Sequence, residues 1–76
     1  MTPQEKFGAA IRNRREKLHL SQEELASIAN VHRTYVGGIE RGERNVSLIN
    51  IMKLCHALSI QPSELFKALD EETNTQ

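Results

Sequence analysis

The chain has 76 residues, enough for one small domain, and its ten basic and ten acidic residues balance to a net charge of zero. No apolar run approaches the roughly 20 residues of a transmembrane helix, and the N-terminus lacks the pattern of a secretory signal. Cys55 is the only cysteine, which excludes an internal disulfide and favours a reducing, cytoplasmic setting. A domain of this size has a small core, and association with a second copy is one usual remedy.

The first predicted helix covers about residues 3–17, with Thr2 as its cap. The second covers about residues 21–29, because Ser21 and Glu24 have the spacing of a capping box. In both segments apolar residues recur every three or four positions, which predicts one inward-facing stripe on each helix. The predicted stripes are Phe7, Ile11 and Leu18 in the first helix, and Leu25, Ile28 and Ala29 in the second.

The third predicted helix begins near His32 and stops at Gly42, which suits a left-handed helix end. Gly37 and Gly38 lie inside it and each costs roughly 1 kcal/mol relative to alanine, so some other requirement should keep them there. The link Asn30–Val31 is too short for an antiparallel pair, so the second and third helices must cross steeply and share one patch of core. This arrangement predicts a helix-turn-helix, whose second helix enters the major groove of DNA.

A fourth helix is predicted after the cap Ser47, and a fifth from about Pro62 to Leu69. The fold class is therefore all-α, with five helices in one domain over residues 1–69. Residues 70–76 are polar and acidic, and we expect them to form a disordered tail. The predicted core stripe of the fourth helix is Leu48, Ile51, Leu54, Cys55 and Leu58.

Three segments resemble one known family: IRNRREKLHLSQEELA, VHRTYVGGIERGERN and ALSIQPSELF. They are similar to the Xre family, the lambda-repressor/Cro-like helix-turn-helix regulators. The HRTYVGGIERGERN run is most similar to the controller proteins of restriction–modification systems, which are homodimeric transcription regulators of this fold. The resemblance implies a non-enzymatic, sequence-specific regulator that binds double-stranded DNA as a homodimer on a two-fold operator. An antitoxin, a phage-type repressor and a pure protein-interaction module remain alternatives.

Arg33, Thr34 and Tyr35 fall on the first turn of the third predicted helix, the turn that reaches base edges in this motif. Arginine can bind guanine bidentately, and threonine offers thymine a hydroxyl and a methyl group. Arg33 could instead grip only phosphate. Tyr35 could contact a phosphate or stack on a sugar or base, unless its ring is half-buried against the helix. Gly38 departs from the family pattern, in which a longer side chain often reads bases.

The resemblance adds Gln22, as a phosphate contact that braces the recognition helix, and Arg44 and Asn45, in a loop that touches phosphates. In the controller proteins an arginine in this loop can also reach the groove. Ser47 and the free amides that follow it form a natural phosphate site. Gln22 and Arg44 could instead be solvated polar side chains. The charge distribution permits a basic face, since residues 1–45 carry eight basic and six acidic residues, a balance of +2.

The resemblance also implies a structural ion pair between Arg15 and Glu40. Ile49 and Met52 fall off the stripe of the fourth helix, and we expect them to form a homodimer interface with Phe66 and Leu69 of the fifth. Met52 and Phe66 could instead close the core of the monomer. The sequence indicates no catalytic set, metal site or cofactor, because Cys55 and the histidines lack partners at suitable spacing. A surface on the third helix or the following loop could also contact RNA polymerase.

Overall fold

The computed structural model describes the backbone of residues 1–73 and the side chains of residues 1–70. Within this part of the chain all regular structure is helical, which confirms the all-α prediction. No helix in it is long and apolar enough to cross a membrane. The five helices are α1 (Pro3–Lys17), α2 (Gln22–Ala29), α3 (Arg33–Glu40), α4 (Leu48–Ala57) and α5 (Pro62–Thr73).

Local capping interactions fix the starts of α1 and α2. Thr2 Oγ1 accepts a hydrogen bond from the Glu5 amide at 3.1 Å, and the Thr2 amide donates back to Glu5 Oε1 at 2.8 Å. This backbone hydrogen bond lowers the pKa of Glu5. Ser21 and Glu24 form the same capping box. Ser21 Oγ accepts a hydrogen bond from the Glu24 amide at 3.0 Å, and the Ser21 amide donates to Glu24 Oε1 at 2.8 Å. The capping predicted for both helices is therefore confirmed.

Left-handed residues end four of the helices. His19, Asn30 and Ser59 have φ angles of 58°, 59° and 51°, and Gly42, predicted as the stop after α3, has a φ of 78°. Asparagine tolerates this conformation better than most residues. Asn30 therefore supplies the sharp turn between α2 and α3 that the short link requires.

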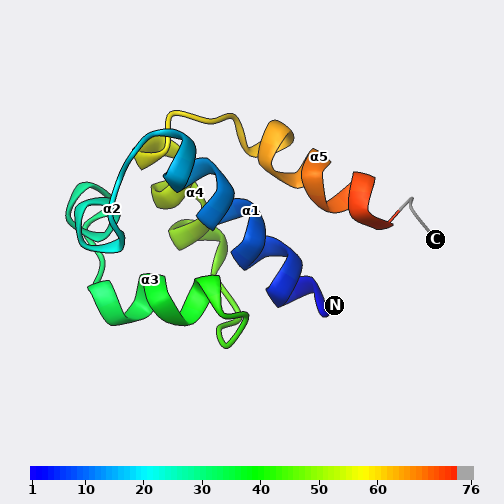
Figure 1. Cartoon of the computed structure of the whole chain (residues 1–76), viewed down its shortest axis with the longest axis horizontal. Coiled ribbons are helices and arrows are strands. Elements are labelled where there is room, and N and C mark those ends of the chain that lie inside the picture. Colours follow the sequence, from blue (N-terminus) through cyan, green and yellow to red (C-terminus); the bar gives the residue numbers. More distant parts are fainter. Residues whose placement is uncertain (74–76) are drawn as a thin grey trace.

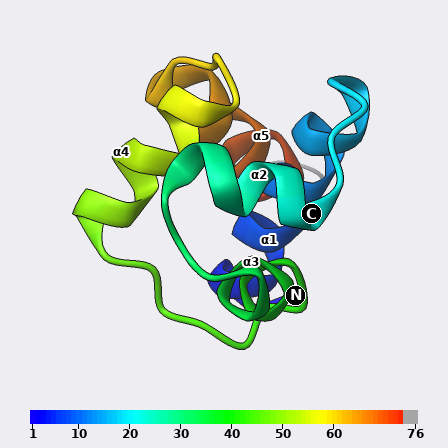
Figure 2. The same cartoon turned by 90° about the vertical axis from the view of Figure 1, so that its left-hand side faces the viewer.

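The helices pack around α1, which contacts α3 on one side and α5 on another, while α4 packs against α2 and α5. Figure 1 shows α1 running diagonally between α3 and α5. In Figure 2, turned by 90°, α3 is seen end-on while α2 lies across the view, so the two helices cross steeply. The predicted helix-turn-helix arrangement is confirmed.

Three predicted core positions are wrong, because Leu18, Ile28 and Leu48 are 36%, 56% and 74% exposed. The buried arc of α2 instead consists of Leu25, Ala26 and Ala29. A helix turns about 100° per residue, which places Ile28 away from that arc. Ala26 is small enough to let α2 approach its neighbours closely. The core consists of Phe7, Ile11, Leu25, Ala26, Ala29, Val36, Ile39, Leu54, Cys55, Leu58 and Leu65.

The backbones of α1 and α3 are in close contact at Gly8. A Cβ atom on Gly8 would overlap the carbonyl oxygen of Ile39 and come within 3.0 Å of the backbone of Glu40. Neither of these neighbours is a flexible side chain that could move aside. Gly8 therefore sets how close the recognition helix lies to α1, a role that the sequence did not indicate.

The last helix is longer than predicted. It extends to Thr73, four residues past the expected end at Leu69, so the tail predicted for residues 70–76 is helical in its first part. No glycine or proline follows Leu69 in the sequence, and nothing local stops the helix there. Residues 74–76 of the predicted tail lie outside the described residues.

Candidate DNA-binding interface

Glu40, the last residue of α3, ties this helix to both α1 and α2. Arg15 donates to it twice, from Nε to Oε2 at 2.7 Å and from Nη2 to Oε1 at 2.9 Å. Gln22 Nε2 donates to the same Oε1 at 3.0 Å, and Arg15 Nη1 also donates to the carbonyl of Leu20 at 2.8 Å. The side chains of Arg15 and Glu40 are only 11% and 3% exposed. Their hydrogen bond raises the pKa of Arg15, so the arginine stays charged.

The structure thus brings Arg15 and Glu40 together in a bidentate, largely buried pair, the geometry that arginine and carboxylate prefer. Gln22 is half-buried beside them at the start of α2. Its amide braces α3 through Glu40, a contact that the sequence did not specify. One carboxylate therefore sets the position of α3 relative to the two helices before it.

The first turn of α3 presents Arg33 and Thr34 to solvent. Arg33 Nη1 lies 3.4 Å from Glu23 Oε2, and the two side chains are 64% and 76% exposed. Exposed ion pairs of this kind are weak and screened by salt. Arg33 can therefore leave Glu23 for a nucleic acid at little cost.

Tyr35 lies half-buried on α3, with its ring packed against the core. Asn50 Nδ2 of α4 donates to the Tyr35 hydroxyl at 3.0 Å. Because the hydroxyl accepts this bond, its own hydrogen remains able to donate to a phosphate oxygen. The Arg44 guanidinium carbon lies 5.7 Å from the centre of the Tyr35 ring. With Thr34 these residues line an open hollow on the surface of the helix-turn-helix.

Asn50 is a member of this cluster that sequence reasoning missed. Its only local signal is the spacing from Ser47, whose hydroxyl accepts a hydrogen bond from the Asn50 amide at 3.2 Å. The bond between its side chain and Tyr35 joins residues 15 positions apart, and only the fold brings them together.

The loop between α3 and α4 is exposed at Arg44, Asn45 and Ser47. Arg41 Nε donates to Glu43 Oε2 at 3.0 Å in this loop, and the hydrogen bond raises the pKa of Arg41 and lowers that of Glu43. Within the described residues Arg44 has no salt bridge, although Arg33 and Arg41 each have one. The loop therefore carries a net positive charge next to α3, and the Arg44 charge also helps to lower the pKa of Glu43.

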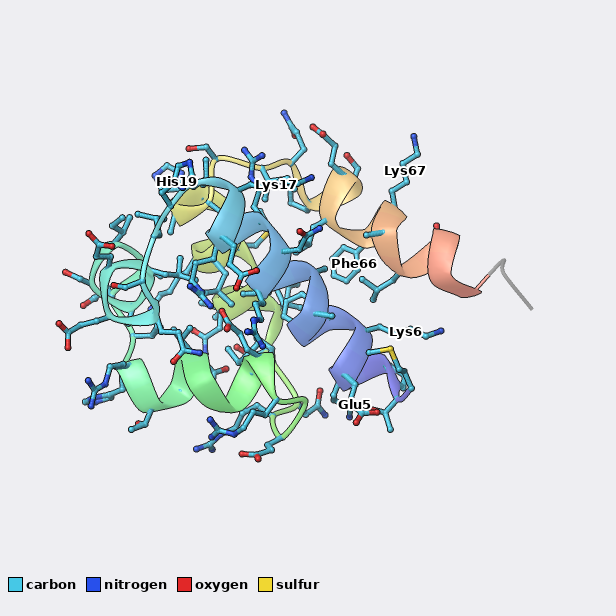
Figure 3. The ribbon with its side chains drawn as sticks, viewed as in Figure 1. Glu5, Lys6, Lys17, His19, Phe66 and Lys67 are labelled. Atoms are coloured by element: carbon cyan, nitrogen blue, oxygen red, sulfur yellow. The ribbon has the colours of Figure 1, made fainter. Side chains whose placement is uncertain are left out.

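Of the residues predicted for a homodimer interface, Ile49 and Met52 are 71% and 50% exposed on α4. Phe66 is 38% exposed, its ring centre lies 6.0 Å from that of Phe7, and Figure 3 shows it pointing from α5 toward α1. Leu69 is half-buried and packs against the core. The first two side chains are therefore free for a partner, whereas the last two also close the domain.

Cys55 is a buried core residue, and burial raises the pKa of its thiol. Among the described residues there is no group of three or more histidine, cysteine, aspartate or glutamate side chains that could hold a metal ion.

A steeply crossed helix pair, anchored to the preceding helix and exposing arginine and threonine on its second member, defines a helix-turn-helix DNA-binding domain. A family model described as helix-turn-helix matches residues 11–65, and the chain belongs to this family. The protein is a DNA-binding transcriptional regulator, and its resemblance to the Xre-like regulators is confirmed.

Several of the proteins most similar in sequence or structure are controller proteins. Control protein C.BamHI of Bacillus amyloliquefaciens is 52% identical over 60 residues, covering 78% of this chain and 74% of the relative. Control protein C.MunI of a Mycoplasma species is 44% identical over 68 residues, covering 88% and 92%. The crystal structure of the restriction–modification controller protein C.AhdI from Aeromonas hydrophila matches with a TM-score of 0.81 and 56% identity, covering 83% of this chain and 96% of that one. The similarity to controller proteins predicted from the sequence is confirmed.

Proposed function

We propose that this protein is a homodimeric controller of a restriction–modification system, acting in the cytoplasm on a two-fold operator. The observation that carries the proposal is the exposed pair Arg33 and Thr34 on a helix held in place by the buried Arg15–Glu40 contact. A rigidly placed helix can present the same side chains to every copy of a DNA site. The likeness to C.BamHI and C.MunI supports the controller role.

In the proposed complex, phosphate contacts fix the register of α3 and base contacts supply specificity. Arg33 would bind a guanine edge and Thr34 a neighbouring thymine. RNA polymerase would contact a part of α3 or of the following loop that the DNA leaves uncovered. The proposed phosphate contacts are the Gln22 amide, the Tyr35 hydroxyl, Arg44, Asn45 and the N-terminus of α4 at Ser47.

The proposed dimer interface centres on the exposed apolar surface of α4. Three apolar side chains of α4 are each at least half exposed: Leu48, Ile49 and Met52. Their burial would stabilise a domain whose own core is small. Apolar side chains grouped on a surface often mark an interface. A two-fold dimer of helix-turn-helix domains places its recognition helices about 34 Å apart, one turn of DNA.

Footprinting on the DNA upstream of the protein's own gene tests this function. We expect protection of two related half-sites whose centres are about one helical turn apart. Contacts from both protomers to phosphates predict that the affinity falls steeply as the salt concentration rises. Absence of protection, or affinity independent of salt, would contradict the proposal and favour a protein-interaction module. Adding RNA polymerase to the same footprint tests the proposed polymerase contact.

Replacing Ile49 with aspartate should convert the dimer to a monomer and weaken operator binding more than tenfold, because a charge would be buried in the apolar interface. Sedimentation velocity gives the oligomeric state, and circular dichroism shows whether the domain remains folded. Ile28→Asp is the matched control, since Ile28 is also exposed but lies on α2. If Ile49→Asp stays dimeric and binds the operator as tightly as the wild type, the interface lies elsewhere.

A further inference from the structure

Arg14 is a half-buried charged residue of α1 that takes no part in the proposed DNA contacts. Its Nε donates to the carbonyl of Leu58 at 3.0 Å, and its Nη2 donates to the carbonyl of Ser59 at 3.0 Å. These carbonyls lie where α4 ends and the turn to α5 begins. Figure 1 shows this turn, in yellow, passing beside the C-terminal half of α1. Arg14 therefore ties α1 to the connection between α4 and α5.

The α4–α5 turn is a place where such a tie has an effect on structure. Backbone carbonyls at the end of a helix lack acceptor partners within the helix. Ser59 also has a φ of 51°, a left-handed conformation that is uncommon for residues other than glycine. A guanidinium stabilises this turn, because its charge is favourable at a helix C-terminus and its donors bind two carbonyls at once. Arg14 thus helps to set the direction in which α5 leaves α4.

The next residue of α1 makes the corresponding contact with the helix-turn-helix. Arg15 binds Glu40 at the end of α3 and the carbonyl of Leu20 just before α2. Consecutive residues of a helix differ in direction by about 100°, so the two arginines reach different neighbours. One turn of α1 therefore holds the helix-turn-helix through Arg15 and the α4–α5 turn through Arg14.

The two helices that this turn joins carry the proposed dimer interface, with Ile49 and Met52 on α4 and Phe66 and Leu69 on α5. The recognition helix α3 packs against α1, and so does α5. The position of α3 relative to the dimer interface is therefore set in part through α1. In a two-fold dimer this position determines how far apart the two recognition helices lie and how they are turned.

We propose that Arg14 is a positioning residue that sets which spacing of half-sites the dimer binds. By holding the α4–α5 turn on α1, it keeps the dimer interface at a fixed angle to the recognition helix. The inference rests on the proposed homodimer and two-fold operator, and it deepens that function by assigning the spacing of the operator to a residue that touches no DNA.

Arg14→Met tests the inference, because methionine keeps a long unbranched side chain without a hydrogen-bond donor. Fluorescence anisotropy gives affinities for the footprinted operator, for the same operator with one base pair inserted between its half-sites, and for a single half-site. The insertion turns one half-site by about 34° relative to the other, so the wild type should prefer the footprinted spacing. The variant should reduce the ratio of the two operator affinities about fivefold or more, a usual size for coupling between two sites. Its affinity for the single half-site should stay that of the wild type.

Two control variants separate positioning from loss of charge and from loss of stability. Arg12→Met removes the same charge from α1, but Arg12 is 63% exposed and pairs with Glu16 of the same helix. Ser21→Ala removes the cap of α2 and destabilises the domain at a place other than the α4–α5 turn. Both variants should keep the wild-type ratio of operator affinities, and circular dichroism shows that each variant is folded.

Arg14→Lys keeps the charge but offers one nitrogen where arginine offers two, so it should lower the ratio by less than Arg14→Met. It takes the place of that variant if Arg14→Met does not fold. The inference is overturned if neither variant lowers the ratio, if the half-site affinity falls as much as the operator affinity, or if a control lowers the ratio equally. A wild-type protein that binds both operators equally overturns the proposed two-fold operator, and the inference with it.

Discussion

Replacing Glu40 with alanine should lower the free energy of unfolding by about 3–5 kcal/mol, the cost of leaving a buried charge without its partner. Arg15 would lose two hydrogen bonds while only 11% exposed, and the Gln22 amide would lose its acceptor. Domains of ordinary stability unfold with about 5–15 kcal/mol, so this variant should be close to unfolding at room temperature.

Urea denaturation followed by circular dichroism measures this loss. Glu43→Ala is the matched control, because Glu43 also binds an arginine in the same region but is 58% exposed. Its removal should change stability little, since solvent already screens that pair. A loss for Glu40→Ala no greater than that for Glu43→Ala would mean that the buried pair does not hold α3 in place.

Replacing Gly8 with alanine should lower the free energy of unfolding by about 2 kcal/mol. Forcing a methyl group into a packed contact costs about 1–3 kcal/mol or more, and here the obstacle is the backbone of Ile39 and Glu40. The gain in helix propensity offsets about 1 kcal/mol of that cost. The net effect is destabilising because neither helix can yield locally without disturbing the Arg15–Glu40 contact.

Gly37→Ala is the matched control for Gly8→Ala, because it should raise the free energy of unfolding rather than lower it. There the added methyl group meets the flexible end of Arg41 at 3.1 Å and makes an ordinary contact with Gln22 Oε1 at 3.6 Å, so the variant should gain up to about 1 kcal/mol. The same urea titrations measure both variants. A Gly8→Ala protein as stable as Gly37→Ala would show that α1 and α3 can separate freely at their crossing.

Helix positions followed closely from the sequence because their signals are local. The boxes at Thr2 and Ser21 involve residues three positions apart, and Asn30 marks the turn between α2 and α3 by its own conformational preference. The resemblance indicated the Arg15–Glu40 pair, which joins residues 25 positions apart and has no local signal.

The remaining features depended on tertiary structure. Periodicity indicates that a helix has an apolar face but does not show which edge of that face meets the core, so Ile28 and Leu48 were placed wrongly. Gly8 matters because it has no side chain where α1 meets the backbone of α3, and the sequence pattern of α1 does not show this contact. Arg14 donates to the carbonyls of Leu58 and Ser59 at 3.0 Å each, across more than 40 positions of sequence.

The shared acceptor at Glu40 also bears on how the domain opens. If α3 moved away from α1 or α2, the Glu40 carboxylate, which is only 3% exposed, would lose hydrogen bonds from Arg15 or Gln22. Separating α3 from its neighbours is therefore costly in free energy. The recognition helix should therefore not melt by itself but should unfold together with its two neighbours as one cooperative unit. A helix that keeps its shape in the free protein has less conformational entropy to lose when it enters a groove.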